Sequence, residues 1–509
     1  MRKRYLEGSS LLSRRSLLRA ATVASGSVVL SKWASGASAA ASWSGPKVTR
    51  TALQTLERQL DGQVVSRQCS NYEEWRQRII WNNRKFSRYP DLIVEAASAE
   101  DVSRAVRFAR QHELKVKTRS GGHSWSGCYL PEDGLVIDVS RLQSIHVDSH
   151  RHIVAVEPGV FGRALNSRLS QDALAFPTAH CGMVPISGFV LGGGIGWNGV
   201  AWGGLSGYNI EAVDVVTSEG EHIHATENSN SDYFWAARGG GPGLFFTVTQ
   251  LHLRCFDEPR SILESTYILP GEELAALAEA LNELGPDIDP AVELLAVMVA
   301  SPEGLRTRSG PYRGRHVAVL NAIAFATAHG QAKRMLSPVA AHPTLRKAIL
   351  SIEERPVTFE DLYRDNEAAF PQRRAKADNI FTNDVVGAAA VLGEHMPEAP
   401  SDGNSPVLLW RGPESEAVGA GSSHGRFYVA TYAQWDNNGM DADNSDWLIG
   451  LYDGLQPFAS GYYINEFDRE ARAEKTPQCY RPENWEHLRY LREKHDPAKV
   501  FHDFLGIDA

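Results

Sequence analysis

Cysteine is scarce in this sequence, and the spacings that hold a metal ion are missing. The 509 residues include five cysteines: Cys69, Cys128, Cys181, Cys255 and Cys479. The chain contains no Cys-x-x-Cys and no His-Glu-x-x-His, so a metal site has no support. The odd number leaves at least one cysteine unpaired or bonded to another group, and spacing does not decide whether the other four form disulfides.

An excess of positive charge is also missing. The formal net charge is -9 at pH 7, which argues against a nucleic-acid partner because such proteins need a basic surface. After the N-terminal region no segment has the length and apolarity of a transmembrane helix. No Gly-x-Gly-x-x-Gly follows the first expected strand, so a nicotinamide dinucleotide domain is a poor fit.

The N-terminal residues look like an export signal. After a basic start, the run Ser13-Arg14-Arg15-Ser16-Leu17-Leu18 is a twin-arginine pattern, residues 17–30 are moderately apolar, and Ala37-Ser38-Ala39 suits cleavage. The alternative is a disordered basic tail with a chance arginine pair. We predict recognition by the twin-arginine export machinery and a periplasmic or secreted protein, since that route carries folded proteins with their cofactors.

Three glycine-rich loops are the most informative positive feature. They are Arg119-Ser120-Gly121-Gly122-His123, the stretch 180–197 that starts at His180-Cys181, and Arg238-Gly239-Gly240-Gly241-Pro242-Gly243. Glycine has no Cβ, so the chain can press its N–H groups onto phosphates and rings. The loops predict a chain wrapped around a dinucleotide, and the nucleophiles His123 and Cys181 suggest covalent bonds to it.

The apolar patterns predict an α+β fold with mixed or antiparallel strands. In the first half they indicate strands at 91–96, 114–118, 135–139 and 153–159, helices at 98–111 and 161–172, and a hairpin over 210–225. After about Asp257 the pattern of apolar and polar residues changes, which indicates a second lobe on the substrate side. There the expected helices are 270–284, 331–336, 345–352, 374–390 and 482–495, and the expected strands are 292–300, 316–326 and 427–432.

The loops, in this order, resemble the berberine bridge enzyme-like branch of the vanillyl-alcohol oxidase flavoprotein superfamily. Further matching segments are Tyr89-Pro90-Asp91, Tyr463-Ile464-Asn465-Glu466-Phe467-Asp468 and Asp496-Pro497 with Val500-Phe501. The resemblance implies a two-lobed PCMH-type FAD-binding domain plus a substrate domain with an antiparallel sheet covered by helices. The implied division is a signal peptide at 1–39, the FAD-binding domain at 40–257, the substrate-binding domain at 258–456 and a C-terminal segment at 457–509 that returns to the FAD domain.

By this resemblance the cofactor is FAD held by two covalent bonds. His123 would bond to the flavin 8α carbon and Cys181 to C6, because imidazole and thiolate can add to an electron-poor flavin. The pyrophosphate would lie against Ser120, Gly121 and Gly122. The other residues expected at the cofactor are Arg119, Ser124, Val184, Gly188, Gly192, Gly193, Gly194, Val248 and Asn465, with Gly239 to Gly243 and Val248 on the adenine side.

The resemblance also suggests how the flavin is reoxidised. A small Val at the position of Val184, three residues after Cys181, is associated in the family with oxygen access to the flavin. The partners expected are therefore a small-molecule substrate and O2, with hydrogen peroxide as product. The alternative for Val184 is a residue chosen for packing.

Two positions depart from the family pattern. Relatives often have Tyr where this chain has Ile195, and Tyr or His where it has Glu466. We predict Glu466 as the general base, since a partly desolvated carboxylate can have a raised pKa and accept a substrate proton. Tyr463 is a weaker candidate because strand alternation would turn it to the opposite face. Glu414 and Glu416 lie where relatives carry a second acid.

The predicted reaction is hydride transfer from an alcohol carbon to the flavin. A sugar or a secondary-metabolite hydroxyl is the expected substrate, with tryptophans such as Trp197, Trp202 and Trp410 at the cleft rim. His180 and His424 are expected to be structural or exposed. The alternatives are oxidation of a C–N or C–C bond in an alkaloid-like compound, and a non-catalytic flavin-binding or ligand-binding protein.

Overall fold

Two sheets form the first half of the molecule in the computed structural model, which describes residues 48–302, 315–415, 417–422 and 424–508. The smaller sheet has the order β1-β2-β4-β3, with β2, β4 and β3 parallel and β1 antiparallel. Its strands are β1 (Gln63–Ser66), β2 (Leu92–Glu95), β3 (Val116–Arg119) and β4 (Leu135–Asp138). The helix α4 (Ala99–Gln111) begins at Ser98, whose side chain accepts a hydrogen bond from the Asp101 N–H.

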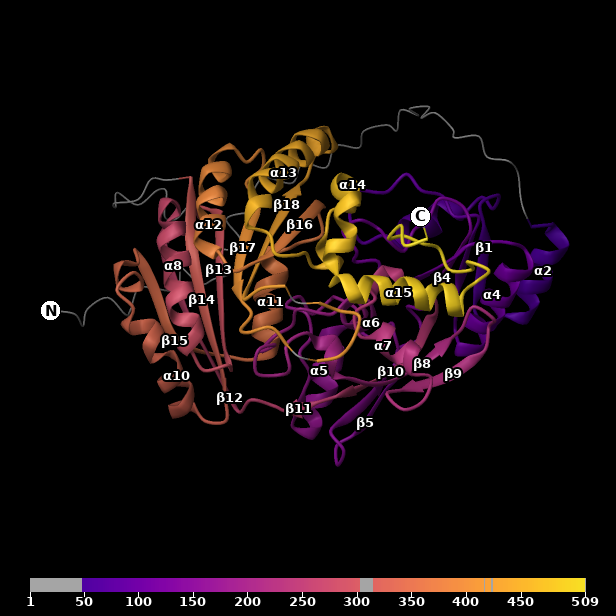
Figure 1. The fold of residues 1–509 in the computed structure, drawn as a ribbon, viewed down its shortest axis with the longest axis horizontal. Coiled ribbons are helices and arrows are strands. Elements are labelled where there is room, and N and C mark those ends of the chain that lie inside the picture. The colour runs from indigo at the N-terminus through magenta and orange to yellow at the C-terminus, as the bar shows by residue number, and fades with distance from the viewer. Residues whose placement is uncertain (1–47, 303–314, 416, 423, 509) are drawn as a thin grey trace.

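The second sheet is antiparallel throughout. Its order is β5-β6-β10-β8-β9, and β8 and β9 form the predicted hairpin. The strands are β5 (Ile145–Asp148), β6 (Ile153–Val156), β8 (Ile210–Val216), β9 (His222–Thr226) and β10 (Thr247–Arg254). The helices α5 (Gly162–Leu169), α6 (Ile186–Leu191) and α7 (Ser231–Ala237) belong to the same half (Figure 1). A short ladder of β7 (Leu174–Ala175) with β11 (Phe256–Asp257) leads toward the third sheet.

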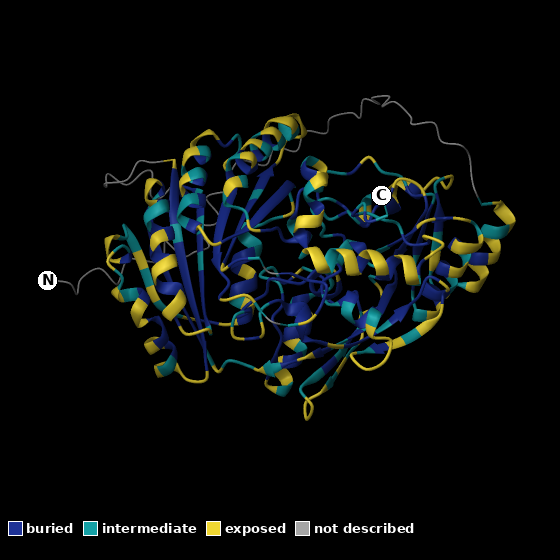
Figure 2. Ribbon diagram, in the orientation of Figure 1, coloured by how far each residue is buried: buried dark blue, intermediate teal, exposed yellow. Residues whose placement is uncertain are grey.

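The third sheet has seven antiparallel strands in the order β15-β12-β14-β13-β17-β18-β16. They are β12 (Ser261–Pro270), β13 (Val292–Ala300), β14 (His316–Ala326), β15 (Leu350–Val357), β16 (Arg374–Thr382), β17 (Ser405–Trp410) and β18 (Phe427–Trp435). One face packs in a common core against α8 (Leu274–Leu284), α10 (His329–Ala341), α12 (Val385–His395) and α13 (Asp441–Leu455). The outer sides of these helices are exposed and the strands are mostly buried, except for the edge strand β15 (Figure 2). The predicted fold class is confirmed.

The other face of this sheet looks toward the first half. The helix α11 (Phe359–Ala369) lies between the two halves and begins with a capping box in which Thr358 and Asp361 bond each other's backbone (Figure 1). The C-terminal segment crosses back through α14 (Arg469–Arg472) and α15 (Pro482–His495). It ends beside β3, where the Val116 N–H donates to the carbonyl of Val500. The segment between α13 and α14, which carries Tyr463 and Glu466, therefore lies where the two halves meet.

Two expected helices are wrong. Residues 345–352 form a short 3-10 turn and the start of β15, and residues 374–390 form β16 and the first part of α12. Polar and apolar residues alternate from Arg374 to Asp378, which is a strand period that the interpretation overlooked. The buried polar side chains have partners, since Lys376 pairs with Asp468 at 2.7 Å and Asp378 pairs with Arg472. Tertiary pairing therefore stabilises a strand where composition favours a helix.

The expected export signal and Glu416 lie outside the described residues. Within the described part of the chain, no helix is both long enough and apolar enough to cross a membrane.

Candidate active site

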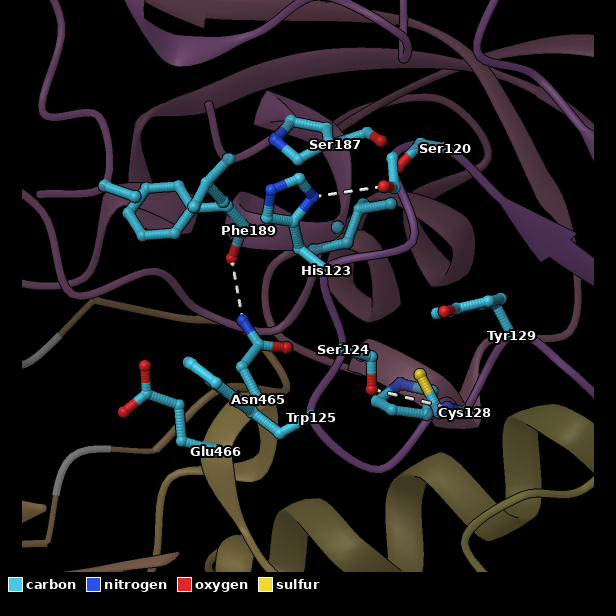
Figure 3. Close-up of a pocket in the computed structure, with 18 of the residues that line it drawn as sticks. Ser120, His123, Ser124, Trp125, Cys128, Tyr129, Ser187, Phe189, Asn465 and Glu466 are labelled. Carbon is cyan, nitrogen blue, oxygen red and sulfur yellow. Dashed lines mark hydrogen bonds between the residues drawn. The ribbon is translucent and has the colours of Figure 1, made fainter. Parts of the chain in front are cut away.

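A cavity of about 350 Å³ lies where the two halves meet. The three glycine loops line one side of it, and β13, β17, β18 and α11 contribute to the other. The predicted site residues that line it are Arg119, Ser120, Gly121, Gly122, His123, Ser124, Cys181, Val184, Gly188, Val248, Tyr463, Asn465 and Glu466. Residues far apart in the sequence thus meet in one place, and Figure 3 shows several of them around the cavity.

His123 presents a neutral nitrogen that has no partner. Its Nδ1 lies 3.0 Å from the carbonyl oxygen of Gly121, which can only accept, so Nδ1 carries the proton. Its Nε2 is buried without a hydrogen-bond partner, and the ring stacks on Trp81 with centroids 4.8 Å apart. Burial lowers the pKa of His123 to about 4, so the imidazole is unprotonated at neutral pH and its Nε2 lone pair is available.

Cys181 is a protonated thiol in this setting. Burial raises its pKa to about 11, and its Sγ lies 4.0 Å from the Glu367 carboxylate at the end of α11. Arg163 from α5 holds that carboxylate at 2.8 Å. A thiolate is therefore not preformed at Cys181, and loss of the proton has to accompany any addition by the sulfur.

The first glycine loop needs its glycines for close approach. A Cβ on Gly121 would come within 1.8 Å of Pro185 Cγ, and one on Gly122, whose φ is +69°, within 2.1 Å of the Ile79 carbonyl oxygen. Arg119, at the start of the loop, forms an ion pair with Asp138 of β4 at 3.0 Å, which holds the loop against the small sheet. At Gly121 and Gly122 the wall of the cavity is therefore bare main chain.

The triple glycine has a different environment from the one expected. Gly192, Gly193 and Gly194 do not line the cavity, whereas Gly188 and Ile195 on either side of them do. A Cβ on Gly192 would come within 2.0 Å of Asn465 Oδ1, so this glycine makes room for Asn465. Asn465 Nδ2 in turn donates to the Phe189 carbonyl at 3.1 Å (Figure 3).

Glu466 lies in the cavity with two phenols on one oxygen. Tyr428 and Tyr432 both donate to its Oε2, at 2.5 and 2.7 Å. Burial raises the pKa of Glu466, and these two hydrogen bonds oppose that rise because they favour the charged form. Burial also raises the pKa of both tyrosines well above the usual value, so the phenols stay protonated and donate.

The expectation that Tyr463 faces away from Glu466 is wrong. Ile464–Glu466 is a 3-10 turn rather than a strand, and Tyr463 precedes it, so strand alternation does not apply. Both side chains line the cavity. The Tyr463 hydroxyl accepts from the Gly194 N–H at 3.2 Å and from Asn465 Nδ2 at 2.9 Å, and burial raises its pKa. Tyr463 is a held, protonated phenol, which leaves Glu466 as the better base.

Sequence reasoning missed the aromatic residues of the site. Tyr428 and Tyr432 stand on β18, and residues four apart on a strand share a face, so the pattern from Phe427 to Tyr432 contained the signal. Trp81 and Trp125 also line the cavity. The prediction that tryptophans form the rim of the cleft is wrong. Trp197, Trp202 and Trp410 are buried in the core and do not line the cavity.

Of the other acidic and histidine residues considered in the sequence, some line the cavity and others do not. Glu414 is a half-exposed partner of Arg481 at 3.0 Å and does not line the cavity. His180 does line it and bonds the buried Glu293 at 2.8 Å, so it contributes to the site and is not only structural. His424 is buried outside the cavity lining.

Known proteins share this architecture. A family model described as an FAD binding domain matches residues 90–226. The FAD-linked oxidoreductase janO of Penicillium janthinellum is 26% identical, covering 86% of this chain and 92% of that protein. The (R)-6-hydroxynicotine oxidase of Paenarthrobacter nicotinovorans is 27% identical, covering 84% and 93%. The structure of berberine bridge enzyme from Eschscholzia californica matches with a TM-score of 0.74 at 19% identity, covering 89% and 98%.

These matches define the class of protein. The chain is an FAD-linked oxidoreductase with a PCMH-type fold. Its fold is similar to that of berberine bridge enzyme and of a BBE-like protein of Physcomitrella patens.

Proposed function

We propose that this enzyme is an exported oxidase that takes a hydride from an alcohol carbon and yields hydrogen peroxide. One observation carries the proposal. The Glu466 carboxylate lies in the same cavity as His123 and Cys181 and accepts hydrogen bonds from two phenols. A carboxylate placed in this way can take the hydroxyl proton of a substrate as the carbon loses its hydride.

The residues present fit the cofactor. His123 and Cys181 would hold FAD by covalent bonds, and the buried, unpartnered Nε2 of His123 is the nucleophile that such a bond requires. The bare backbone of Ser120, Gly121 and Gly122 offers N–H groups to a pyrophosphate. When bound, FAD supplies the electron-accepting ring, which takes up the hydride and gives the electron pair to O2.

The proton chemistry belongs to Glu466 and its phenols. Tyr428 and Tyr432 donate to Oε2, and Trp125 also hydrogen-bonds the carboxylate, so three neighbours fix the orientation of the proposed proton acceptor. Since burial raises the pKa of Glu466, the group is a stronger base than an exposed carboxylate.

Val184 is the residue proposed to leave room for O2 to reach the flavin. Its side chain lines the cavity next to the Cys181 turn, where the Val184 N–H donates to the Cys181 carbonyl at 3.3 Å. A short branched side chain leaves space there that a longer Leu would fill. The twin-arginine segment supports export of the folded, flavin-loaded protein to the periplasm or beyond.

Oxidation of a C–N bond is the second candidate. It is supported by the likeness to (R)-6-hydroxynicotine oxidase, whose name states an amine-containing substrate. In that case Glu466 would accept the proton of an amine or of a ring hydroxyl. A panel of alcohols and amines separates the two reactions by which substrates release peroxide.

The same panel tests catalysis itself. We expect peroxide from at least one class of substrate, together with bleaching of the flavin absorbance when oxygen is excluded. No peroxide on any substrate, together with no photoreduction of the flavin, would support a non-catalytic binding protein instead.

A further inference from the structure

A second, smaller cavity lies next to the first. Its volume is about 90 Å³, and it shares four lining residues with the main cavity: Leu295, Asn366, Phe370 and Val407. The two cavities therefore share a boundary, called the neck below, that is formed by β13, β17 and the end of α11. Phe370 borders this neck, with its ring 5.0 Å from that of Tyr432, one of the two phenols on Glu466.

The floor of the second cavity is one face of the seven-stranded sheet. On β13, Leu295, Val297 and Val299 line it, whereas Leu294, Ala296 and Met298 between them are buried against the helices. The register extends this floor sideways, since Val297 lies opposite Val319 of β14 and Val407 of β17. Adjacent strands thus form a continuous apolar track that leads away from Glu466.

Most residues that line this second cavity are apolar, and some of its polar side chains already bond other groups of the protein. Thr266 donates to Asn321 at 2.9 Å, and the Asn366 amide donates to the Leu362 carbonyl at 3.0 Å. The charged residues that line the second cavity, among those the structure describes, are Arg373 and Asp402. A sugar placed on this track would leave hydroxyls without partners, and each such loss weakens binding by about tenfold or more.

We propose that the substrate carries an extended hydrocarbon or fused-ring framework that crosses the neck and lies on this track. The inference rests on the proposed function, because it assumes that the reacting carbon is bound beside Glu466. The apolar part would then cover Leu295, Val297 and Val319. The substrate class is an apolar alcohol or amine, and it is not a sugar.

A chain-length series tests the proposal through binding as well as turnover. Straight-chain alcohols and the matching amines, from butanol to dodecanol, are added to the flavin-loaded protein. Binding is followed by the change in flavin absorbance, and turnover by peroxide release. We expect the affinity to rise about fourfold for each added methylene, equivalent to about 0.8 kcal/mol, until the track is full.

Variants at one position give effects of opposite sign. Val319→Phe fills part of the track, so the gain in affinity with chain length should stop at a shorter alcohol or amine. Val319→Ala enlarges the track, so the gain should continue to a longer one. Val147→Phe is the matched control, because Val147 is a partly buried valine of β5 that lines neither cavity. The control should reproduce the wild-type series.

The outcomes separate the two levels of the proposal. Affinity that does not grow with chain length, or sugars that bind better than alkanols of similar size, would overturn the apolar track and leave the oxidase intact. A normal chain-length series in binding, with no flavin reduction by any alcohol or amine, would overturn the oxidase and leave the track. An identical series in Val319→Phe and the wild type would also overturn the track.

Discussion

The two halves of the molecule shape the cavity by different means. The first half contributes bare main chain at Gly121 and Gly122, which allow no side chain, together with loop side chains such as His123 and Cys181. The second half contributes side chains from neighbouring strands, among them Leu295, Leu409 and Tyr428. A backbone wall suits a cofactor with constant phosphates and rings, whereas a side-chain wall can be altered one residue at a time. We therefore expect the loops to bind the cofactor and the sheet face to select the substrate.

Of the variants described here, we expect the largest loss of activity from substitution of the proposed base, Glu466, which lies where the two halves meet. Glu466→Gln keeps the size of the side chain and removes its ability to accept a proton. We expect kcat/KM for peroxide release to fall by about 10²- to 10⁴-fold with the flavin still bound. Glu414→Gln is the control, since Glu414 is an ion-paired carboxylate outside the cavity. Equal rates for Glu466→Gln and the wild type would remove Glu466 from the mechanism.

The backbone wall should be the least tolerant part of the cavity. In Gly121→Ala the added Cβ meets Pro185 at 1.8 Å, whereas in Gly188→Ala it meets only the Ser120 hydroxyl at 3.8 Å. We expect Gly121→Ala to lower the free energy of unfolding by about 1–3 kcal/mol, as overpacking does, and to reduce flavin incorporation. Denaturant unfolding compares the two variants. Similar losses in both would mean that steric fit at Gly121 is not what shapes this wall.

Oxygen access should be adjustable without loss of the cofactor. Val184→Leu fills space beside the Cys181 turn, and we expect reoxidation by O2 to slow by about tenfold, equivalent to about 1.4 kcal/mol on the barrier. Stopped-flow absorbance of the reduced protein mixed with oxygen gives the rate. Reduction by the substrate serves as the internal control and should change little. An unchanged reoxidation rate would contradict the assignment of Val184.

The smallest effect should come from the phenols that hold the base. Tyr432→Phe removes a donor that favours the charged form of Glu466, so the pKa of Glu466, already raised by burial, should rise further. The ionised carboxylate is the active form, so activity falls as the pH drops through this pKa, and the fall should begin at a higher pH in the variant. Tyr490→Phe, at an exposed tyrosine outside the cavity, is the control for the pH profile.

The cofactor side could be predicted from the sequence and the substrate side could not. The glycine loops, His123 and Cys181 are local signals, each contained within a few residues, and the structure brings them to one cavity. The partners of Glu466 are 34 and 38 residues away on β18, and only strand pairing brings them to it. The 3-10 turn that contains Glu466 also escaped prediction, because a strand period had been assumed for Tyr463. A motif of a few neighbouring residues can be recognised in the sequence. Which side chains meet from different strands of a sheet can be seen only in the structure.

The central claim is that this chain holds FAD by covalent bonds from His123 and Cys181 in the wall opposite the substrate. The most direct measurement is to denature the purified protein in acid and to ask whether the yellow colour stays with the polypeptide. The account predicts that it stays in the wild type and in either single variant, His123→Ala or Cys181→Ala, and leaves only the double variant. Free flavin released from the wild type would contradict it.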